Sequence, residues 1–257
     1  LNECGLPKLM ALELFKPFVI SWLLLHEYAP NSRAASRMIE AHESIVWDAL
    51  DEVIKGRYVL LNRAPSLHRL SIQAFQPKLI DGMAIQLHPL VASGFNADYD
   101  GDQMAIHLPL SAEAQKEAQE LMTAQHNLLK PADGSPVLAI YQDVVLGSYY
   151  LTYDKPGTES DKPLAFSSVY EAEMAYDRGD IALQTPIRVF TKKEIRDTTL
   201  GRVIFNEILP VDYPYDNGVQ TSKHLKKVMA NIFNDYGSKV TVEVADKLKD
   251  LAFEYET

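Results

Sequence analysis

The chain has 257 residues, 47% of them hydrophobic, and is therefore long enough to bury one or two cores. Its formal net charge of −10 argues against a protein that binds nucleic acid over its whole surface, so any contact with a polyanion must be local. Its single cysteine, Cys4, excludes intrachain disulfides and cysteine-based zinc sites, and its longest apolar run, residues 18–25, is too short to cross a bilayer.

The first region of the chain shows a mixed pattern of helices followed by short strands. Pro7 opens a helical pattern, which Pro17 is expected to interrupt or kink. Residues 33–42 and 45–55 have the amphipathic spacing of two short helices, the second ended by Gly56. Four strand-like runs, joined by turns with proline and glycine, then follow at residues 58–62, 71–75, 84–87 and 104–108. Such short strands suit a small β-barrel with the helices packed beside it.

The next segments lead to a predicted domain boundary. Ser111 is expected to cap a helix that runs to about Met122, and residues 142–151 predict a further helix. Residues 155–163 are polar and contain proline and glycine, a composition typical of a linker. We therefore predict two domains, at residues 1–154 and 155–257.

The second region is predicted to be mainly helical. The sequence Ser-Val-Tyr-Glu at residues 168–171 is typical of a capping box, in which the first and last side chains satisfy backbone groups at the start of a helix. Residues 183–190 resemble a strand, whereas residues 221–233 and 240–255 have helical spacing. This region shows no pattern of catalytic residues.

The most specific chemistry lies in the run Asn-Ala-Asp-Tyr-Asp-Gly-Asp-Gln at residues 96–103. Asp98, Asp100 and Asp102 alternate, and three converging carboxylates would repel one another unless a cation neutralised them. Gly101 permits the curvature that would bring all three to one ion. Mg²⁺ is the expected ion, because it usually takes a few carboxylates and leaves other positions to water and phosphate. A solvated acidic turn is the alternative.

A calcium loop of the EF-hand type also begins with alternating aspartates, but its later positions do not match. Counting Asp98 as position one, Gln103 replaces the glycine required at position six, and Pro109 replaces the glutamate required at position twelve. Histidines at positions 68, 88 and 107 lack metal-ligand spacing and are read as packing or hydrogen-bonding residues. Magnesium at the three aspartates therefore remains the prediction.

The acidic run, extended to Asn-Ala-Asp-Tyr-Asp-Gly-Asp-Gln-Met-Ala, resembles the catalytic loop of the largest subunit of multisubunit RNA polymerases. The resemblance covers nearly the whole chain and is weakest from Lys155 to Phe190. The further matching segments are Cys-Gly-Leu-Pro-Lys at residues 4–8, Leu-Leu-Asn-Arg-Ala-Pro-Ser-Leu-His-Arg at 60–69, Gln-Leu-His-Pro-Leu at 86–90, Gln-Asp-Val-Val-Leu-Gly at 142–147, and Thr-Thr-Leu-Gly-Arg at 198–202. The first and last of these segments resemble the bacterial β′ form in particular.

This resemblance implies an α+β fold: part of a double-psi β-barrel with packed helices, followed by a mainly helical region on the pore or funnel side. It implies that Asp98, Asp100 and Asp102 hold a catalytic Mg²⁺ for nucleotidyl transfer from a ribonucleoside triphosphate to an RNA 3′ end on a DNA template. Arg63 and Asn96 match positions that contact the sugar of the incoming nucleotide. Gln142 matches a position near the nucleotide site, with a capping or turn role as its alternative.

The resemblance also implies partners: the β, α and ω subunits and a sigma factor, together with the DNA template, RNA and ribonucleoside triphosphates. No membrane association is expected, and a cytoplasmic location follows from the single cysteine and the lack of a signal peptide. We expect a fragment of a larger enzyme, inactive by itself. A non-catalytic assembly module that keeps the loop as a structural cation site is the alternative function.

Overall fold

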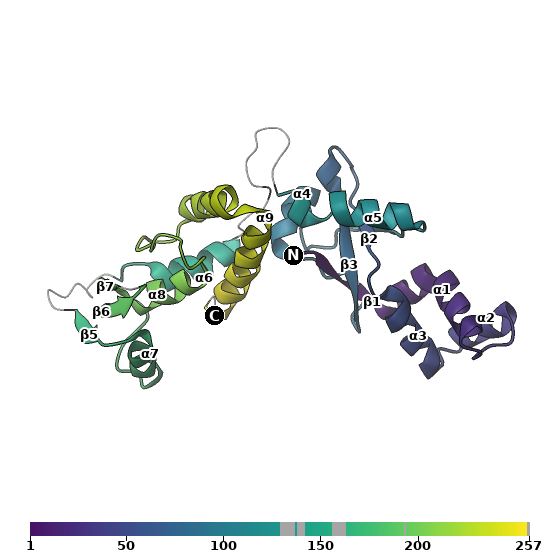
Figure 1. Cartoon of the computed structure of the whole chain (residues 1–257), viewed down its shortest axis with the longest axis horizontal. Helices are drawn as coiled ribbons and strands as arrows, with labels where there is room; N and C mark the ends of the chain where they lie inside the picture. Colours follow the sequence, from purple (N-terminus) through teal and green to yellow (C-terminus); the bar gives the residue numbers. More distant parts are fainter. Residues whose placement is uncertain (129–136, 138–141, 156–162, 193, 256–257) are drawn as a thin grey trace. The chain divides into compact units, whose positions relative to one another are not determined.

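The computed structural model describes residues 1–128, 137, 142–155, 163–192 and 194–255, and the chain divides into two compact units, Leu1–Ala132 and Asp133–Thr257 (Figure 1). The boundary lies earlier than the predicted one after residue 154. The reason is that helix α6 (Gln142–Thr152) packs against α8 (Leu200–Glu207) and α9 (Ser222–Glu254) of the second unit. Most of the predicted linker, residues 156–162, lies outside the described residues.

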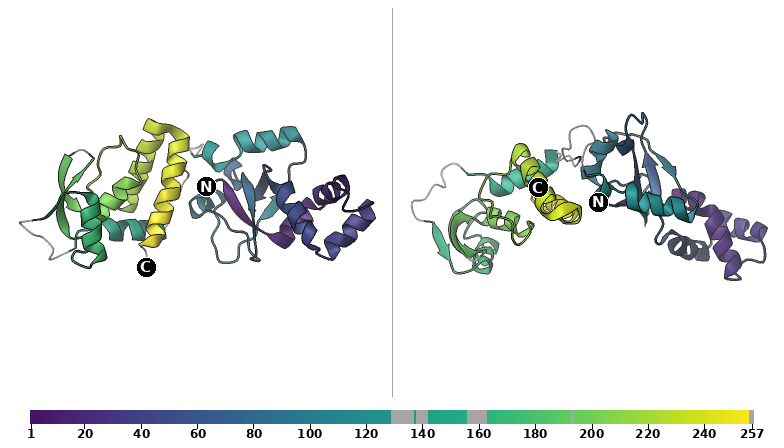
Figure 2. Two further views of the ribbon diagram at one scale, coloured as in Figure 1. Left: turned by 60° about the horizontal axis from the view of Figure 1, so that its bottom comes forward. Right: turned by 45° about the horizontal axis from the view of Figure 1, so that its top comes forward.

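Three helices open the first unit after a short strand: α1 (Lys8–Leu25), α2 (Ser32–Glu40) and α3 (Ser44–Ile54). Figure 2 shows them as a group beside the sheet of this unit. Pro17 lies inside α1, which continues past it, so the predicted interruption does not occur. The apolar faces of these helices and the sheet share one core, whose fully buried members include Phe15 and Leu50.

The sheet of the first unit has four strands in the order β1-β3-β2-β4. Strand β1 pairs with β3 in parallel, whereas β2 pairs with β3 and β4 in antiparallel fashion. The predicted strand at residues 84–87 is reduced to a single bridge between Gly5 and Gln86, whose backbones exchange two hydrogen bonds of 2.8 Å. The strand bounds are Glu3–Pro7 for β1, Val59–Asn62 for β2, Ile72–Ile80 for β3 and Ala105–His107 for β4.

Helix α5 (Ala112–Leu121) follows β4, and the Ser111 side chain accepts a hydrogen bond from the Ala114 N–H at 3.1 Å, which confirms the predicted cap. Short 3₁₀ turns complete the unit at Arg69–Ser71, Pro89–Val91 and Ala124–His126. Together these elements form a mixed α+β unit, as predicted.

The second unit combines helices with a sheet that the sequence only partly indicated. Its three strands run in the order β5-β6-β7, with β5 parallel and β7 antiparallel to β6. The expected strand at residues 183–190 is β6, whereas β5 and β7 were not predicted. The bounds are Leu164–Phe166 for β5, Val169–Asp177 for helix α7, Pro186–Thr191 for β6 and Glu194–Thr199 for β7.

Two glycines let the helices of the second unit approach backbone to backbone. A side chain at Gly147 of α6 would overlap the carbonyl of Ala252 in α9, and a side chain at Gly201 of α8 would overlap the carbonyl of Leu151. Within α9, Gly237 has φ 78° and divides the element into two helical segments, in agreement with the two predicted helices. Among the described residues, no helix is long and apolar enough to cross a membrane.

Candidate metal centre

The acidic loop leaves a short helix, α4 (Ala92–Phe95), and returns to the edge strand β4. Asn96 ends α4 in the left-handed conformation, with φ 49°, which asparagine tolerates better than most residues. The buried ring of Phe95 packs against Phe75 of β3 and anchors this start of the loop to the sheet. The loop is thus held at both ends by ordered elements.

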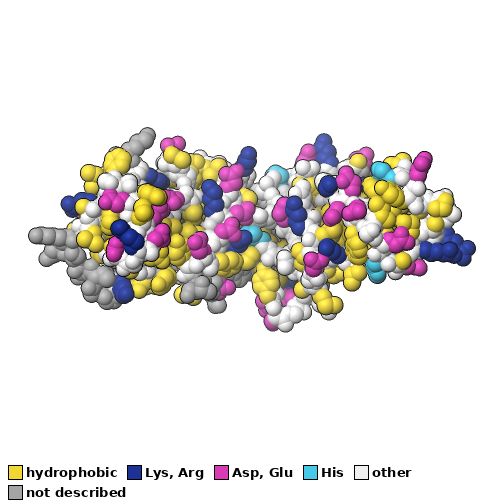
Figure 3. All heavy atoms as spheres, turned by 90° about the horizontal axis from the view of Figure 1, so that it is seen from below, with side chains coloured by type: hydrophobic (Ala, Val, Ile, Leu, Met, Phe, Trp, Pro, Cys, Tyr) yellow, Lys and Arg dark blue, Asp and Glu magenta, His cyan; other side chains and the backbone are white. Residues whose placement is uncertain are grey.

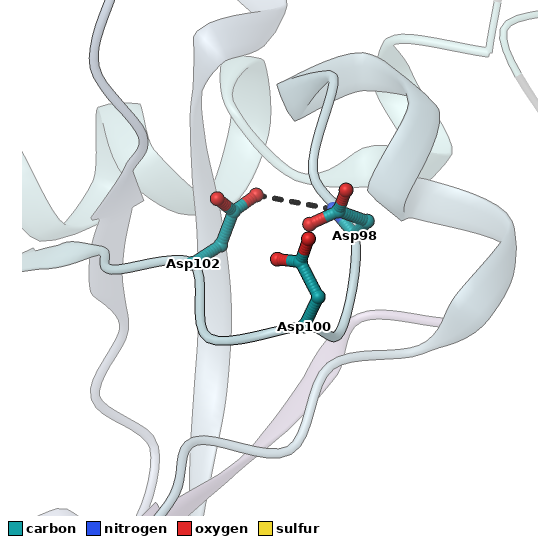
Figure 4. A group of neighbouring side chains, drawn as sticks. All are labelled: Asp98, Asp100 and Asp102. Atoms are coloured by element: carbon teal, nitrogen blue, oxygen red, sulfur yellow. Dashed lines mark hydrogen bonds between the residues drawn. The ribbon is translucent and has the colours of Figure 1, made fainter.

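The three aspartates of this loop converge. One carboxylate oxygen from each of Asp98, Asp100 and Asp102 lies within 4.8 Å of the others, and Figure 4 shows the three side chains turned toward one another. Two ligands on opposite sides of Mg²⁺ are separated by about 4.2 Å, twice the usual metal–oxygen distance. The carboxylates are therefore close to the spacing that one hard divalent cation requires, and their all-oxygen chemistry fits such an ion.

The backbone of the loop explains this convergence. Gly101 has φ 121°, a conformation that residues with a side chain rarely adopt, as its predicted role in curving the loop requires. The Asp98 N–H donates to Asp102 Oδ2 at 3.1 Å and closes the turn (Figure 4). The Tyr99 hydroxyl donates to the Leu87 carbonyl at 3.1 Å and ties the loop to the neighbouring segment.

Arg63 binds the third aspartate directly. Its Nε donates to Asp102 Oδ2 at 2.7 Å, and its Nη2 donates to Oδ1 at 3.1 Å, so the contact is bidentate. Arg63 follows β2, whose last residue Asn62 lies opposite Ala105 at the start of β4, and this pairing brings the two segments together. Sequence reasoning placed Arg63 at the nucleotide sugar and missed this contact, because no local pattern reports a strand register.

The charges in the loop alter one another's protonation. A hydrogen bond with the Asp100 carboxyl, followed by desolvation and by the charges of Asp100 and Asp102, raises the pKa of Asp98. In contrast, the hydrogen bond from Arg63, and then that from the Asp98 N–H, lowers the pKa of Asp102. The loop therefore contains one carboxylate that holds its negative charge firmly and one that is easier to protonate.

The other predicted residues are placed as follows. Asn96 is exposed at the start of the loop. Gln142 is the first residue of α6, but its side chain lies outside the described residues. His88 Nδ1 accepts a hydrogen bond from the Leu90 N–H at 3.2 Å, a capping role. Within the described part of the chain, the group of side chains that could hold a metal consists of aspartates and includes no histidine.

An apolar cavity of about 550 Å³ lies beside the loop and includes Asp98 and Asp102 in its lining. Three methionines, Met10, Met83 and Met104, are among its lining residues. On the face of the molecule in Figure 3, acidic and basic side chains are interspersed, so the net negative charge is not gathered into one large patch there. The acidic loop is thus a local feature next to an apolar hollow.

Comparison with known proteins identifies the family of the chain. The sequence matches the family RNA polymerase Rpb1, domain 2, over residues 29–124, which include the acidic loop, and the family RNA polymerase Rpb1, domain 3, over residues 127–257.

Several curated relatives are about half identical to the chain. It is 51% identical to the DNA-directed RNA polymerase subunit beta′ of Tropheryma whipplei and 50% identical to that of Desulforamulus reducens, in both cases over 100% of the chain. It is 49% identical to the same subunit of Acetivibrio thermocellus over 99% of the chain. These matches cover 21%, 22% and 24% of the respective relatives, so the chain spans less than a quarter of their length. The chain therefore belongs to the RNA polymerase Rpb1 family and is similar to one segment of bacterial β′ subunits.

Proposed function

We propose that this chain carries the catalytic magnesium loop of a DNA-directed RNA polymerase and serves nucleotidyl transfer to an RNA 3′ end on a DNA template. The observation that carries the proposal is the convergence of the Asp98, Asp100 and Asp102 carboxylates within 4.8 Å on a loop anchored at both ends. Similarity to DNA-directed RNA polymerase β′ subunits supports the choice of reaction.

In this proposal the three aspartates hold Mg²⁺. When bound, the ion supplies positive charge that lowers the pKa of the attacking RNA hydroxyl and stabilises the oxygen as it forms the new bond. The chain itself contributes position: Gly101 and the Asp98–Asp102 hydrogen bond keep the carboxylates together before substrate arrives. No side-chain nucleophile is required, because phosphoryl transfer depends mainly on positioning and charge stabilisation.

Arg63, Asn96 and Gln142 are proposed to bind the incoming ribonucleotide, with Arg63 and Asn96 at its sugar. Both sugar-binding side chains suit this role chemically, since a ribose 2′-hydroxyl both donates and accepts hydrogen bonds. An amide offers a donor and an acceptor, and a guanidinium offers several donors. The contact between Arg63 and Asp102 supports the proposal, because it brings a sugar-binding candidate to the metal loop.

The wider assembly is also part of the proposal. The four-stranded sheet of the first unit would belong to a double-psi β-barrel, and the second unit would lie on the pore or funnel side of the enzyme. The partners would be the β, α and ω subunits, a sigma factor, DNA and RNA, in the cytoplasm. The isolated chain would be inactive.

The test is Asp100→Asn in the assembled polymerase that carries this chain. We expect RNA extension to be lost while the subunits still assemble, because the substitution replaces a charged carboxylate ligand by a neutral amide without touching the core. Asp81→Asn is the matched control, since Asp81 is 88% exposed and pairs with Lys8 rather than with the loop. Extension at a normal rate by the Asp100→Asn enzyme would refute a catalytic role and favour a structural cation site.

A further inference from the structure

The contact between Arg63 and Asp102 differs from the other ion pairs of the chain. Their side chains are only 20% and 23% exposed, and among the lysine–carboxylate and arginine–carboxylate pairs in the described part of the chain this is the one with both partners less than a quarter exposed. A bidentate guanidinium–carboxylate contact is also among the stronger hydrogen-bonded pairs. The contact is therefore more than a loose surface pair.

The donors that reach Asp102 leave it little capacity for a further partner. Oδ2 accepts from Arg63 Nε and from the Asp98 N–H, and Oδ1 accepts from Arg63 Nη2. A carboxylate offers about four lone-pair positions, and these three donors already occupy three of them. A divalent cation bound by Asp102 would also lie next to the positive guanidinium. Arg63 and the ion thus depend on the same carboxylate and repel each other.

We infer that Arg63 competes with the divalent cation for Asp102, so that cation binding releases the guanidinium from the loop. This inference rests on the proposed function and extends it to the order of events. The released side chain regains the N–H donors that the sugar of a nucleotide would use. Arg63 is therefore a substrate-binding residue with two alternative partners, Asp102 and the sugar, and the cation binds before the sugar contact forms.

The sign of the effect on cation affinity follows from charge. By linkage, if the ion weakens the contact between Arg63 and Asp102, that contact must weaken ion binding by the same factor. A doubly charged ion and a guanidinium about 6 Å apart in a water-like medium repel each other strongly enough to lower the affinity for the ion by about a factor of ten, and salt reduces this effect. Removing the guanidinium should therefore tighten cation binding by about three- to tenfold.

The experiment measures Mn²⁺ binding to the 257-residue chain by electron paramagnetic resonance of the free ion. We expect Arg63→Gln to bind Mn²⁺ about three- to tenfold more tightly than the unaltered chain. Arg63→Lys should have an affinity between these two, because lysine keeps the positive charge but cannot make the bidentate contact of a guanidinium. Arg69→Gln removes the same charge from an exposed neighbouring position and should change the affinity by less than about twofold. Weaker or unchanged binding by Arg63→Gln would overturn the inference, because a purely structural Arg63 would weaken the site when lost.

Asp100→Asn separates this inference from the proposed function. If Mn²⁺ binding does not depend on Asp100, the loop is not the cation site, and the proposed function and the competition both fail. If binding depends on Asp100 but Arg63→Gln does not tighten it, only the competition fails.

A measurement on the unaltered chain covers the case of a variant that does not fold. The Arg63 Nε–H should exchange slowly with water and should exchange faster when Mg²⁺ is added, as followed by nitrogen-15 NMR. Unchanged exchange at saturating Mg²⁺ would contradict the release of Arg63.

Discussion

Replacing Gly101 by alanine should weaken cation binding without crowding the site. Apart from its neighbours in the chain, no heavy atom of the described residues lies within 4 Å of the position that the new methyl group would take, so the penalty comes from the backbone at φ 121°. A residue with a side chain held in such a region costs on the order of 1–3 kcal/mol. If the loop of the variant relaxes to an unstrained form in the free chain and returns to the bent form only when the ion binds, that cost appears in the affinity, as a loss of about 5- to 150-fold.

Gly56→Ala is the matched control for Gly101→Ala. Gly56 also has a positive φ, of 72°, and the described part of the chain places no other atom within 4 Å of its added methyl group, but it lies after α3 and away from the acidic loop in sequence. It should lower the free energy of unfolding by about 1–2 kcal/mol while leaving Mn²⁺ affinity unchanged. The assays are Mn²⁺ titration and urea unfolding with and without the ion. A Gly101→Ala chain that bound Mn²⁺ as tightly as the unaltered chain would refute the argument that this glycine sets the convergence.

Three further predictions concern single side chains. In the assembled enzyme, Asn96→Ala should reduce the ratio of kcat/KM for ribonucleotides over deoxyribonucleotides by a factor of a few to about ten, since one hydrogen bond is worth about 0.5–1.5 kcal/mol; equal losses for both substrates would exclude a sugar contact. Cys4 is 2% exposed, and burial, with the charge of Glu3, raises the pKa of its thiol to about 12, so a thiol reagent at pH 8 should label it only when the first unit unfolds. Hydrogen bonds from the Ser167 hydroxyl and N–H lower the pKa of Glu171 below its usual 4.5, so the stabilisation by its carboxylate is present above pH 4.5 and is lost as the pH falls through the lowered pKa. The difference in unfolding free energy between the unaltered chain and Glu171→Gln should therefore shrink below about pH 4.5. A difference that stays constant with pH would contradict this.

The acidic loop could be predicted from sequence because its information is local. Alternating carboxylates with an embedded glycine specify both the candidate ligands and the bend, and the structure brings Asp98, Asp100 and Asp102 together as expected. The contact between Arg63 and Asp102 could not be predicted in the same way. It joins residues 39 positions apart in the chain, and only the pairing of β2 with β4 brings them within reach.

The differences between the predicted and the observed fold also arise from tertiary contacts. Strand β1 was missed because its five residues include glycine and proline, and its parallel partner β3 lies far along the chain. The predicted strand at residues 71–75 ended before Pro77, because proline usually interrupts a strand, whereas β3 continues to Ile80. The domain boundary was placed too late, since the close approach of α6 and α9 at Gly147 cannot be read from linker composition.

The pairing of β2 with β4 decides how the arrangement of the acidic loop can be lost. Strand β4 has three residues, at the edge of its sheet, and two of them, Ala105 and His107, are exposed. Short edge strands of this kind open in local fluctuations that leave the core intact. When β4 frays, Asp102 loses its alignment with Arg63 although the rest of the unit stays folded. The working lifetime of the site is therefore governed by this edge, and amide hydrogen exchange at His107, which pairs with Leu60 of β2, would report it more faithfully than the melting temperature of the chain.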